Sequence, residues 1–340
     1  MSTEPARELD FRLLNEFQRD FPLRPAPYAE LAQRLNSDEG SVLVALRRLL
    51  EQGMVSRVGA VFSPRRIGAS TLAALAVPPE RLDAVADQVS ACPEVNHNYE
   101  RENAYNLWFV ATAPNAAHLD RTIADIAATT GCPLIRLPLL EEFHIDLGFD
   151  LNGGAKPEMA AQSVQEPAIH PGLLPAEQKL MAALQDGLPL EARPYASLAV
   201  RACMTEAEVL ITLQAWLEAG LIKRLGVVVR HHELGYTANA MCVWDVPDEA
   251  ASAIGQRLAG MPGVTLCYRR ARHLPDWRYN LYCMIHGRER GEVEQLVAQI
   301  NQRVALDDFP HTVLFSLRRY KQRGARYVSN ADVDNGALHV

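Results

Sequence analysis

The segment Pro27-Tyr28-Ala29-Glu30-Leu31-Ala32 returns, with one substitution, 167 residues later as Pro194-Tyr195-Ala196-Ser197-Leu198-Ala199. The same offset relates further pairs, which are Pro22-Leu23 and Pro189-Leu190, Gly53 and Gly220, Arg57 and Arg224, Gly59 and Gly226, and Gly68 and Gly235. A fixed offset over about 45 positions indicates a duplicated unit. Beyond it the offset grows slightly, because Tyr99 matches Tyr268 and Tyr105-Asn106-Leu107 matches Tyr279-Asn280-Leu281. We therefore expect one module that is present twice.

Each copy begins with apolar residues at helical spacing, which predicts a set of helices. The apolar stripes are Leu9, Leu13, Leu14 and Phe17, then Val42, Leu46, Leu49 and Leu50, and in the second copy Val209, Leu213 and Trp216. Gly53 is a natural C-cap, and Thr205 with Glu208 forms a capping box. The segments Val55–Phe62 and Ile222–Val229 then fit a wing, a β-hairpin arm. Each copy is thus predicted to start with a winged helix-turn-helix unit.

Each copy continues as strand, helix, strand, strand, helix, strand, the order of a ferredoxin-like βαββαβ domain. The expected elements are Leu72–Val77, Glu80–Ala91, Val95–Arg101, Asn106–Thr112, Ala116–Thr130 and Ile135–Ile145, then Ala238–Val246, Glu249–Ala259, Val264–Arg270, Tyr279–His286, Glu289–Val304 and His311–Tyr320. The predicted domains are 1–66 and 176–232 (winged helix-turn-helix), 67–150 and 233–328 (ferredoxin-like), 151–175 (a Pro-rich linker) and 329–340 (a tail). The expected fold class is α+β, a tandem duplication of this two-domain module.

Composition excludes several classes of protein. A chain of 340 residues, 48% hydrophobic and 22% charged, suits a soluble protein of two or more domains. No apolar run approaches the ~20 residues of a membrane-spanning helix. Residues 1–10 lack the basic and apolar regions of a signal peptide, so we expect a cytoplasmic protein without membrane association. The six cysteines are scattered without a CxxC pair, which favours free thiols over a metal or Fe–S site.

A helix-turn-helix suggests DNA binding, which needs Lys and Arg on the recognition helix. Residues 205–221, the expected recognition helix of the second copy, contain three glutamates and no Lys or Arg. The first copy places Asp38 and Glu39 at the start of its helix, and only Arg47 and Arg48 follow. With a net charge of −7, such helices would repel phosphates. We expect no DNA binding, and a scaffold and dimerisation role for these units.

Charge differs sharply between the two βαββαβ halves. Residues 95–149 carry three basic and seven acidic residues, whereas residues 264–328 carry twelve basic and six acidic ones. The basic residues cluster in 269–278 and 318–326. Aromatic and amide groups interleave with them, namely Tyr268, Trp277, Tyr279, Asn280, Tyr282 and Tyr320. This combination favours a site for a planar polyanion. Solvated surface charge and single-stranded nucleic acid are the alternatives.

His97 is the strongest catalytic candidate among the histidines, because Asn, Tyr and Arg101 flank it within one short predicted strand. An imidazole there could serve as a proton donor or an iron ligand. The other histidines considered are His144, His231, His232 and His286. A lone histidine is more often structural or exposed. No spacing predicts a metal cage of several ligands, a Gly-rich phosphate loop or a Ser–His–Asp triad.

The order of domains resembles the Lrp/AsnC regulators, and longer strings resemble one branch of that family. His97-Asn98-Tyr99-Glu100-Arg101, Tyr105-Asn106-Leu107-Trp108-Phe109 and residues 143–151 (FHIDLGFDL) are similar to siroheme decarboxylases. So are residues 266–270 (LCYRR), 277–287 (WRYNLYCMIHG) and 318–324 (RRYKQRG) in the second copy. The chain therefore resembles, nearly end to end, siroheme decarboxylases of the fused NirD–NirL type, which act in d1 haem biosynthesis.

This resemblance implies conversion of siroheme to 12,18-didecarboxysiroheme by loss of two acetate carboxyl groups as CO₂. The catalytic candidates that it implies are His97, His231, His232 and Lys321. The implied substrate-binding residues are Tyr99, Arg101, Tyr268, Arg269, Arg270, Arg272, Trp277, Tyr279, Arg318 and Arg319. No cofactor is implied beyond the iron of siroheme, with His97 or His232 as a candidate axial contact. Leu266 stands where the first copy has His97, and this difference leaves open which half holds the active centre.

Two other functions compete with this one: a DNA-binding regulator with a small effector, and a haem or tetrapyrrole sensor without chemistry. The duplication predicts an internal pseudo-dimer. Further homo-oligomers, or association with other proteins of d1 haem biosynthesis, stay open.

Overall fold

The computed structural model describes residues 4–145, 173–230 and 237–327. His231, His232, most of the predicted linker and the predicted tail lie outside these ranges. The first copy consists of α1 (Glu4–Glu16), α2 (Pro27–Arg34), α3 (Glu39–Glu51), β1 (Val55–Phe62), α4 (Pro64–Ile67), β2 (Ala69–Leu75), η1 (Pro79–Arg81), α5 (Leu82–Ala91), β3 (Val95–Arg101), β4 (Leu107–Ala113), α6 (Ala116–Thr130) and β5 (Leu134–Ile145).

The second copy repeats this order without counterparts of α4 and η1 among its described residues. It consists of α7 (Pro175–Gln185), α8 (Pro194–Ala202), α9 (Glu206–Glu218), β6 (Ile222–Val229), β7 (Ala238–Trp244), α10 (Asp248–Ala259), β8 (Val264–Arg270), β9 (Leu281–Gly287), α11 (Arg290–Val304) and β10 (His311–Gln322). The predicted duplication is therefore visible element by element. No helix within the described ranges has the length and apolar character needed to cross a bilayer.

The two helical units pack into one shared core, formed by apolar residues of α1–α3 and α7–α9. The repeated Pro-Tyr pair explains part of this association. Tyr28 donates its hydroxyl to the carbonyl of Pro189 at 3.0 Å, and Tyr195 donates to the carbonyl of Pro22 at 2.9 Å. Both rings are fully buried. Each copy thus places its tyrosine in the other copy, so the repeat is retained because it forms the interface between the copies.

The prediction that each copy carries a hairpin wing is wrong. β1 and β6 are single strands that pair antiparallel with each other, from Val55 opposite Val229 to Phe62 opposite Ile222. We call this two-stranded sheet the ribbon. The retained glycines meet at its centre, where Gly59 lies opposite Gly226. A Cβ at Gly226 would lie 2.4 Å from the carbonyl oxygen of Gln18, so no side chain fits. A strand of this length pairs with its copy as readily as with a hairpin neighbour.

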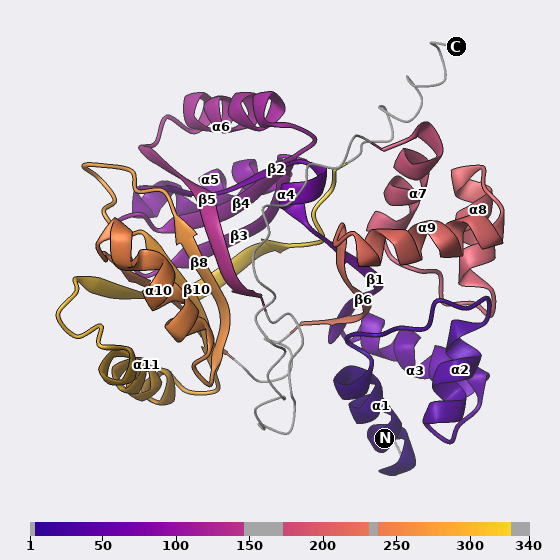
Figure 1. Cartoon of the computed structure of the whole chain (residues 1–340). Coiled ribbons are helices and arrows are strands. Elements are labelled where there is room, and N and C mark those ends of the chain that lie inside the picture. Colours follow the sequence, from indigo (N-terminus) through magenta and orange to yellow (C-terminus); the bar gives the residue numbers. More distant parts are fainter. Residues whose placement is uncertain (1–3, 146–172, 231–236, 328–340) are drawn as a thin grey trace.

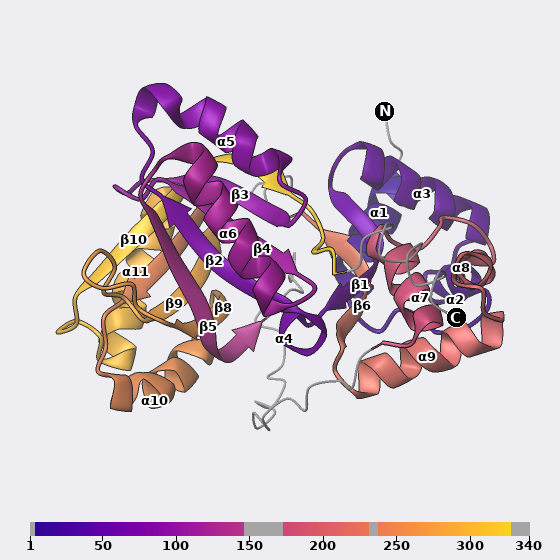
Figure 2. The ribbon, with the colours of Figure 1, turned by 90° about the horizontal axis from the view of Figure 1, so that it is seen from above.

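The remaining strands form one closed barrel in the order β10-β3-β4-β2-β5-β8-β9-β7. The barrel closes because the last strand of each copy is long enough to serve both sheets. The first half of β5 pairs with β2 and its second half with β8, while β10 pairs first with β7 and then with β3. Figures 1 and 2 show this barrel on one side of the molecule, the helical units on the other and the ribbon between them. The predicted internal pseudo-dimer is thus a single barrel with no open sheet edge.

Each sheet packs one face on helices, α5 and α6 in the first copy and α10 and α11 in the second. The opposite faces meet inside the barrel. There Trp108, Trp277 and Tyr282 pack with aliphatic residues of both copies. The indole of Trp277 donates to the Tyr282 hydroxyl at 2.7 Å. Aromatic packing therefore fills this part of the barrel.

Candidate functional site

A bulge in β3 sets the direction of His97. The pairing of β3 with β4 is irregular between Val95 and His97. Such a bulge puts two successive side chains on one face of a sheet. Val95 packs into the helix-side core and Asn98 donates to the carbonyl of Ala86 in α5, so both point away from the barrel interior. His97 instead shares a face with Tyr99, and the two rings stack with their centroids 6.2 Å apart.

Arginines surround this pair of rings. Arg319 of β10 lies directly opposite Tyr99, and the Arg101 guanidinium lies 5.7 Å from the centre of the Tyr99 ring. Burial raises the pKa of Tyr99, while the charges of Arg101, Arg319 and Arg230 lower it. Burial, together with the charge of Arg57, lowers the pKa of His97 to about 4. We call the face formed by His97, Tyr99 and Arg319, with Arg57 beside it, the β3 site.

The duplication provides a second copy of this face with different chemistry. Leu266 replaces His97, and Tyr268 lies opposite Glu142 of β5 where Tyr99 lies opposite Arg319. Lys223 of the ribbon donates to both carboxylate oxygens of Glu142, at 2.7 and 2.8 Å. The second copy has therefore lost the imidazole, and a carboxylate of the chain itself occupies the place of an arginine. The two faces therefore differ in charge: the β3 site has an imidazole and arginines, and its counterpart has an ion pair.

Arg101 and Arg270 occupy equivalent positions and form equivalent contacts. Arg101 donates to the carbonyl of Leu314, and Arg270 donates to the carbonyl of Leu137, each at 3.0 Å. Each guanidinium thereby joins its own second strand to the long strand of the other copy. Burial lowers the pKa of Arg101 to about 10 and also lowers that of Arg270. Contacts shared by both copies indicate that these two residues close the barrel, which is a positioning role.

Several predicted site residues are bound to the chain's own groups. Arg269 and Arg272 form ion pairs with Asp248, and Arg272 also pairs with Asp245 at 2.9 Å. Arg272 donates further to the carbonyls of Val246 and Arg278. The basic run 269–278 is therefore largely neutralised within the second copy. That this run forms the polyanion site stays a prediction, and the carboxylates that pair with it lie outside the segment whose charge suggested it.

The second basic run divides between two faces of β10. Arg318 pairs with Asp83 at 2.7 Å, and the ammonium of Lys321 donates to the carbonyls of Ser90 and Cys92 at the end of α5. Both therefore point toward the helix layer, whereas Arg319 lies opposite Tyr99. Trp277 and Tyr279 pack on one another in the aromatic cluster inside the barrel. The structure thus brings together His97, Tyr99 and Arg319 and separates Lys321 and Arg318 from them.

Two arginines near the β3 site were not among the predicted site residues. Arg57 comes from β1, and Arg230 directly follows β6. The only signal in the sequence was the match of Arg57 with Arg224, which read as a residue kept for the fold. Neither arginine is close to His97 in sequence, so only the position of the ribbon beside the barrel reveals them.

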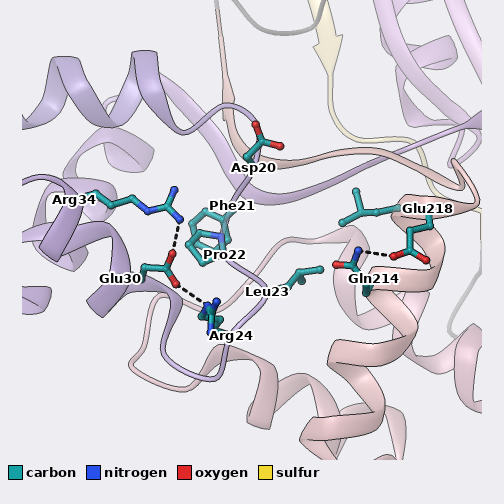
Figure 3. Close-up of a pocket in the computed structure, with 10 residues that line it drawn as sticks. Asp20, Phe21, Pro22, Leu23, Arg24, Glu30, Arg34, Gln214 and Glu218 are labelled. Atoms are coloured by element: carbon teal, nitrogen blue, oxygen red, sulfur yellow. Dashed lines mark hydrogen bonds and ion pairs between the residues drawn. The ribbon is translucent and has the colours of Figure 1, made fainter. Parts of the chain in front are cut away.

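A separate open cavity of about 750 Å³ lies between the helical units (Figure 3). Its polar groups contact one another: Glu30 forms ion pairs with Arg24 and Arg34, and Gln214 donates to Glu218. Asp20 also lines it. This acidic, self-paired lining does not suit a polycarboxylate, and none of the predicted site residues belongs to it.

Comparison with known proteins agrees with this architecture. The family model of the AsnC-like ligand binding domain matches residues 66–144 and 233–321, and that of the siroheme decarboxylase NirDL-like HTH domain matches residues 10–55 and 177–223. The chain is 47% identical over 319 residues to the siroheme decarboxylase NirDL subunit of Paracoccus denitrificans, covering 94% of this chain and 97% of that protein. It is 34% identical to the siroheme decarboxylase of Hydrogenobacter thermophilus, covering 94% of each chain.

Solved structures agree as well. The crystal structure of a siroheme decarboxylase NirDL matches with a TM-score of 0.70 at 29% identity, over 98% of this chain and all of that chain. A NirDL structure in co-complex with an iron-uroporphyrin III analogue matches equally well, at 28% identity. The fold and the family models define a tandem Lrp/AsnC-like protein with paired ligand-binding domains. Within that class, the chain belongs to the siroheme decarboxylase family in its fused NirDL form. The predicted fold class and family are confirmed.

Proposed function

We propose that this chain decarboxylates siroheme at the β3 site, removing the C12 and C18 acetate carboxyl groups as CO₂ to give 12,18-didecarboxysiroheme in d1 haem biosynthesis. The observation that carries the proposal is the asymmetry between the copies. An imidazole and arginines gather on β3 and β10, whereas Leu266 and the Lys223–Glu142 ion pair occupy the equivalent place in the second copy. Membership of the siroheme decarboxylase family supports the reaction.

Binding follows from charge and shape. Siroheme is a planar macrocycle with eight carboxylates, and arginine forks bind carboxylates bidentately. Arg319 lies opposite Tyr99, and the aromatic faces of Tyr99 and His97 lie side by side next to it. Such flat rings offer packing surface to a planar ligand, and the arginines offer partners for its rim. The iron belongs to the substrate, and we propose no further cofactor.

The chemistry needs a proton and a place for an electron pair. When the bond between the acetate CH₂ and its carboxylate breaks, CO₂ leaves and the electron pair stays on the carbon, where the adjoining ring delocalises it. A proton delivered to that carbon completes the methyl group. We assign the proton to the imidazolium form of His97, as general acid. Burial lowers the pKa of His97, and nearby carboxylates of a bound substrate would raise it and favour proton uptake.

His97 and His232 are also candidates for an axial contact to the substrate iron. An imidazole nitrogen bound to iron carries no proton, so one nitrogen cannot perform both roles at once. Electronic spectra of the anaerobic complex with iron-uroporphyrin III, for wild type and His97→Leu, distinguish the roles. Identical spectra support the acid assignment, and loss of the axial-ligand bands in the variant contradicts it.

The test of the function is anaerobic incubation of the full chain with siroheme, followed by mass spectrometry. The proposal predicts a product lighter by the mass of two CO₂. Unchanged siroheme despite tight binding would indicate a tetrapyrrole sensor. Specific nanomolar DNA binding that weakens with salt would instead favour a regulator. We place the reaction in the cytoplasm.

A further inference from the structure

We infer that the ribbon completes the substrate site, with Arg57 and Arg230 as carboxylate-binding residues that the helical units hold against the β3 face. This inference rests on the proposed function and deepens it. It assigns to the paired helix-turn-helix units a direct part in recognising a polycarboxylated tetrapyrrole, in place of nucleic acid.

The position of Arg57 follows from contacts with the chain after β10. Gln322 lies opposite His97, and the Arg323 amide donates to the carbonyl of Asn96 at 2.9 Å. Gly324 comes next, and a Cβ there would lie 2.9 Å from an Nη atom of Arg57. The Arg57 guanidinium therefore rests on the backbone that borders His97. Its charge contributes to the lowered pKa of the imidazole. Gly324 leaves the space that this arginine needs.

Arg230 approaches from the other strand of the ribbon. Its backbone amide donates to the carbonyl of Met54 at 2.8 Å, which fixes the residue beside the start of β1. Its charge acts on the Tyr99 hydroxyl together with those of Arg101 and Arg319. Arg101 and Arg319 lie beside Tyr99, and the Arg230 side chain lies near Gly53, where a Cβ would be 3.7 Å from one of its Nη atoms.

Both arginines retain donor capacity. Arg57 donates to the carbonyl of Ala60 at 2.8 Å, yet its Nε and the Nε of Arg230 are buried without a hydrogen-bond partner among the described residues. Within the same ranges no ion pair joins either arginine to a carboxylate. Asp186 acts on Arg57 from a distance, but it pairs with Arg326 at 2.7 Å. A buried donor without a partner is costly, so a ligand carboxylate would relieve that cost.

Lys223, another cation of the ribbon, differs in this respect. Lys223 is bound to Glu142, and Arg224 donates to the carbonyl of Gln18 at 2.7 Å. Arg224 is the copy of Arg57 in the duplication, yet it serves contacts between the helical units. The two strands of the ribbon therefore differ from each other, as β3 and β8 do. Arg57, which we infer binds a ligand carboxylate, lies beside the backbone that borders His97.

The experiment measures the affinity of the full chain for iron-uroporphyrin III, which carries eight carboxylates, and for iron coproporphyrin III, which carries four. Haem absorbance is followed in an anaerobic titration. Arg57→Gln and Arg230→Gln should each weaken iron-uroporphyrin binding about tenfold to a hundredfold, with a smaller effect on iron coproporphyrin. Arg57→Lys should recover part of the loss. Gly324→Ala should weaken binding while keeping the charge, because its Cβ displaces the guanidinium.

Lys223→Gln is the matched control, because it removes a ribbon cation that Glu142 already neutralises, and its affinity should stay within about twofold of wild type. Unchanged affinity in both Arg57→Gln and Arg230→Gln would overturn the inference even if the wild type converts siroheme. An equal loss for both porphyrins would also overturn it, since that indicates a general structural effect. A wild type that binds with these arginine effects but converts no siroheme would refute the proposed function alone.

Discussion

The substitution His97→Leu isolates the role of the imidazole, because the second copy of the module already carries leucine at this position. Leu266 follows the same bulge in β8 that precedes His97 in β3. The change is therefore compatible with the strand and its pairing. We expect the reaction rate to fall about 10²-fold to 10⁴-fold, the usual contribution of a positioned general acid.

The same substitution has a calculable effect on stability. The fold lowers the pKa of His97 from 6.5 to about 4. At 1.36 kcal/mol per pH unit, this corresponds to about 3 kcal/mol in favour of the neutral ring. Between these two pH values the unfolded chain binds a proton that the native state does not, so wild type loses stability as the pH falls through this window. His97→Leu lacks this loss and should gain up to about 3 kcal/mol relative to wild type between pH 7 and pH 4.

Two assays check these expectations. Turnover of siroheme by mass spectrometry reports the acid role, and urea unfolding of both proteins at pH 7, 5.5 and 4 reports the buried imidazole. The control is Leu266→His, which puts the ring on the second copy and should not restore activity to His97→Leu. Turnover of His97→Leu within about twofold of wild type would contradict the role of His97 as general acid. A stability difference that does not change with pH would contradict the lowered pKa of the buried imidazole.

Three further predictions concern the frame around the site. Lys321→Met should lower the free energy of unfolding by about 1–2 kcal/mol, because the ammonium caps the carbonyl end of α5. Turnover of the folded variant should stay unchanged. A large loss of turnover in folded protein would instead support a catalytic role for Lys321. Tyr28→Phe and Tyr195→Phe should each cost about 1 kcal/mol in urea unfolding, since each loses an equivalent hydrogen bond; strongly unequal costs would contradict the reciprocal interface. Arg101→Met and Arg270→Met should both lower the melting temperature, each by freeing a buried carbonyl of the other copy, and an effect confined to Arg101 would argue against a shared structural role.

Most of the architecture could be predicted from the sequence, because the duplication shows the pattern of most helices and strands twice. Val55–Phe62 and Ile222–Val229 have the predicted bounds. Their pairing could not be predicted, since the sequence of a strand does not indicate whether it pairs within a hairpin or with the equivalent strand of the other copy. Closure of the barrel could not be predicted from the sequence for the same reason. The sequence indicates that β5 and β10 are long strands. It does not indicate that their second halves pair with the other copy, because that pairing is a long-range contact.

The site was predicted in part. His97 and Tyr99 could be identified from one short string, because strand alternation, adjusted by a bulge, puts them on one face. The charge of residues 264–328 did not reveal that Arg269 and Arg272 have carboxylate partners, because Asp245 and Asp248 lie outside that segment. The match of Arg57 with Arg224 could not reveal a role for Arg57 at the site, since the two side chains have different partners in the folded chain.

We propose that only one of the two duplicated faces binds the substrate. The measurement that tests it most directly is the number of iron-uroporphyrin III molecules bound per chain, determined by anaerobic titration of wild type, Arg319→Glu and Glu142→Gln, with circular dichroism to confirm folding. Arg319→Glu gives the β3 site the charge of its counterpart. We expect one equivalent per chain in wild type and in Glu142→Gln, and loss of tight binding in Arg319→Glu. Two equivalents in wild type, or binding retained in Arg319→Glu and lost in Glu142→Gln, would contradict it.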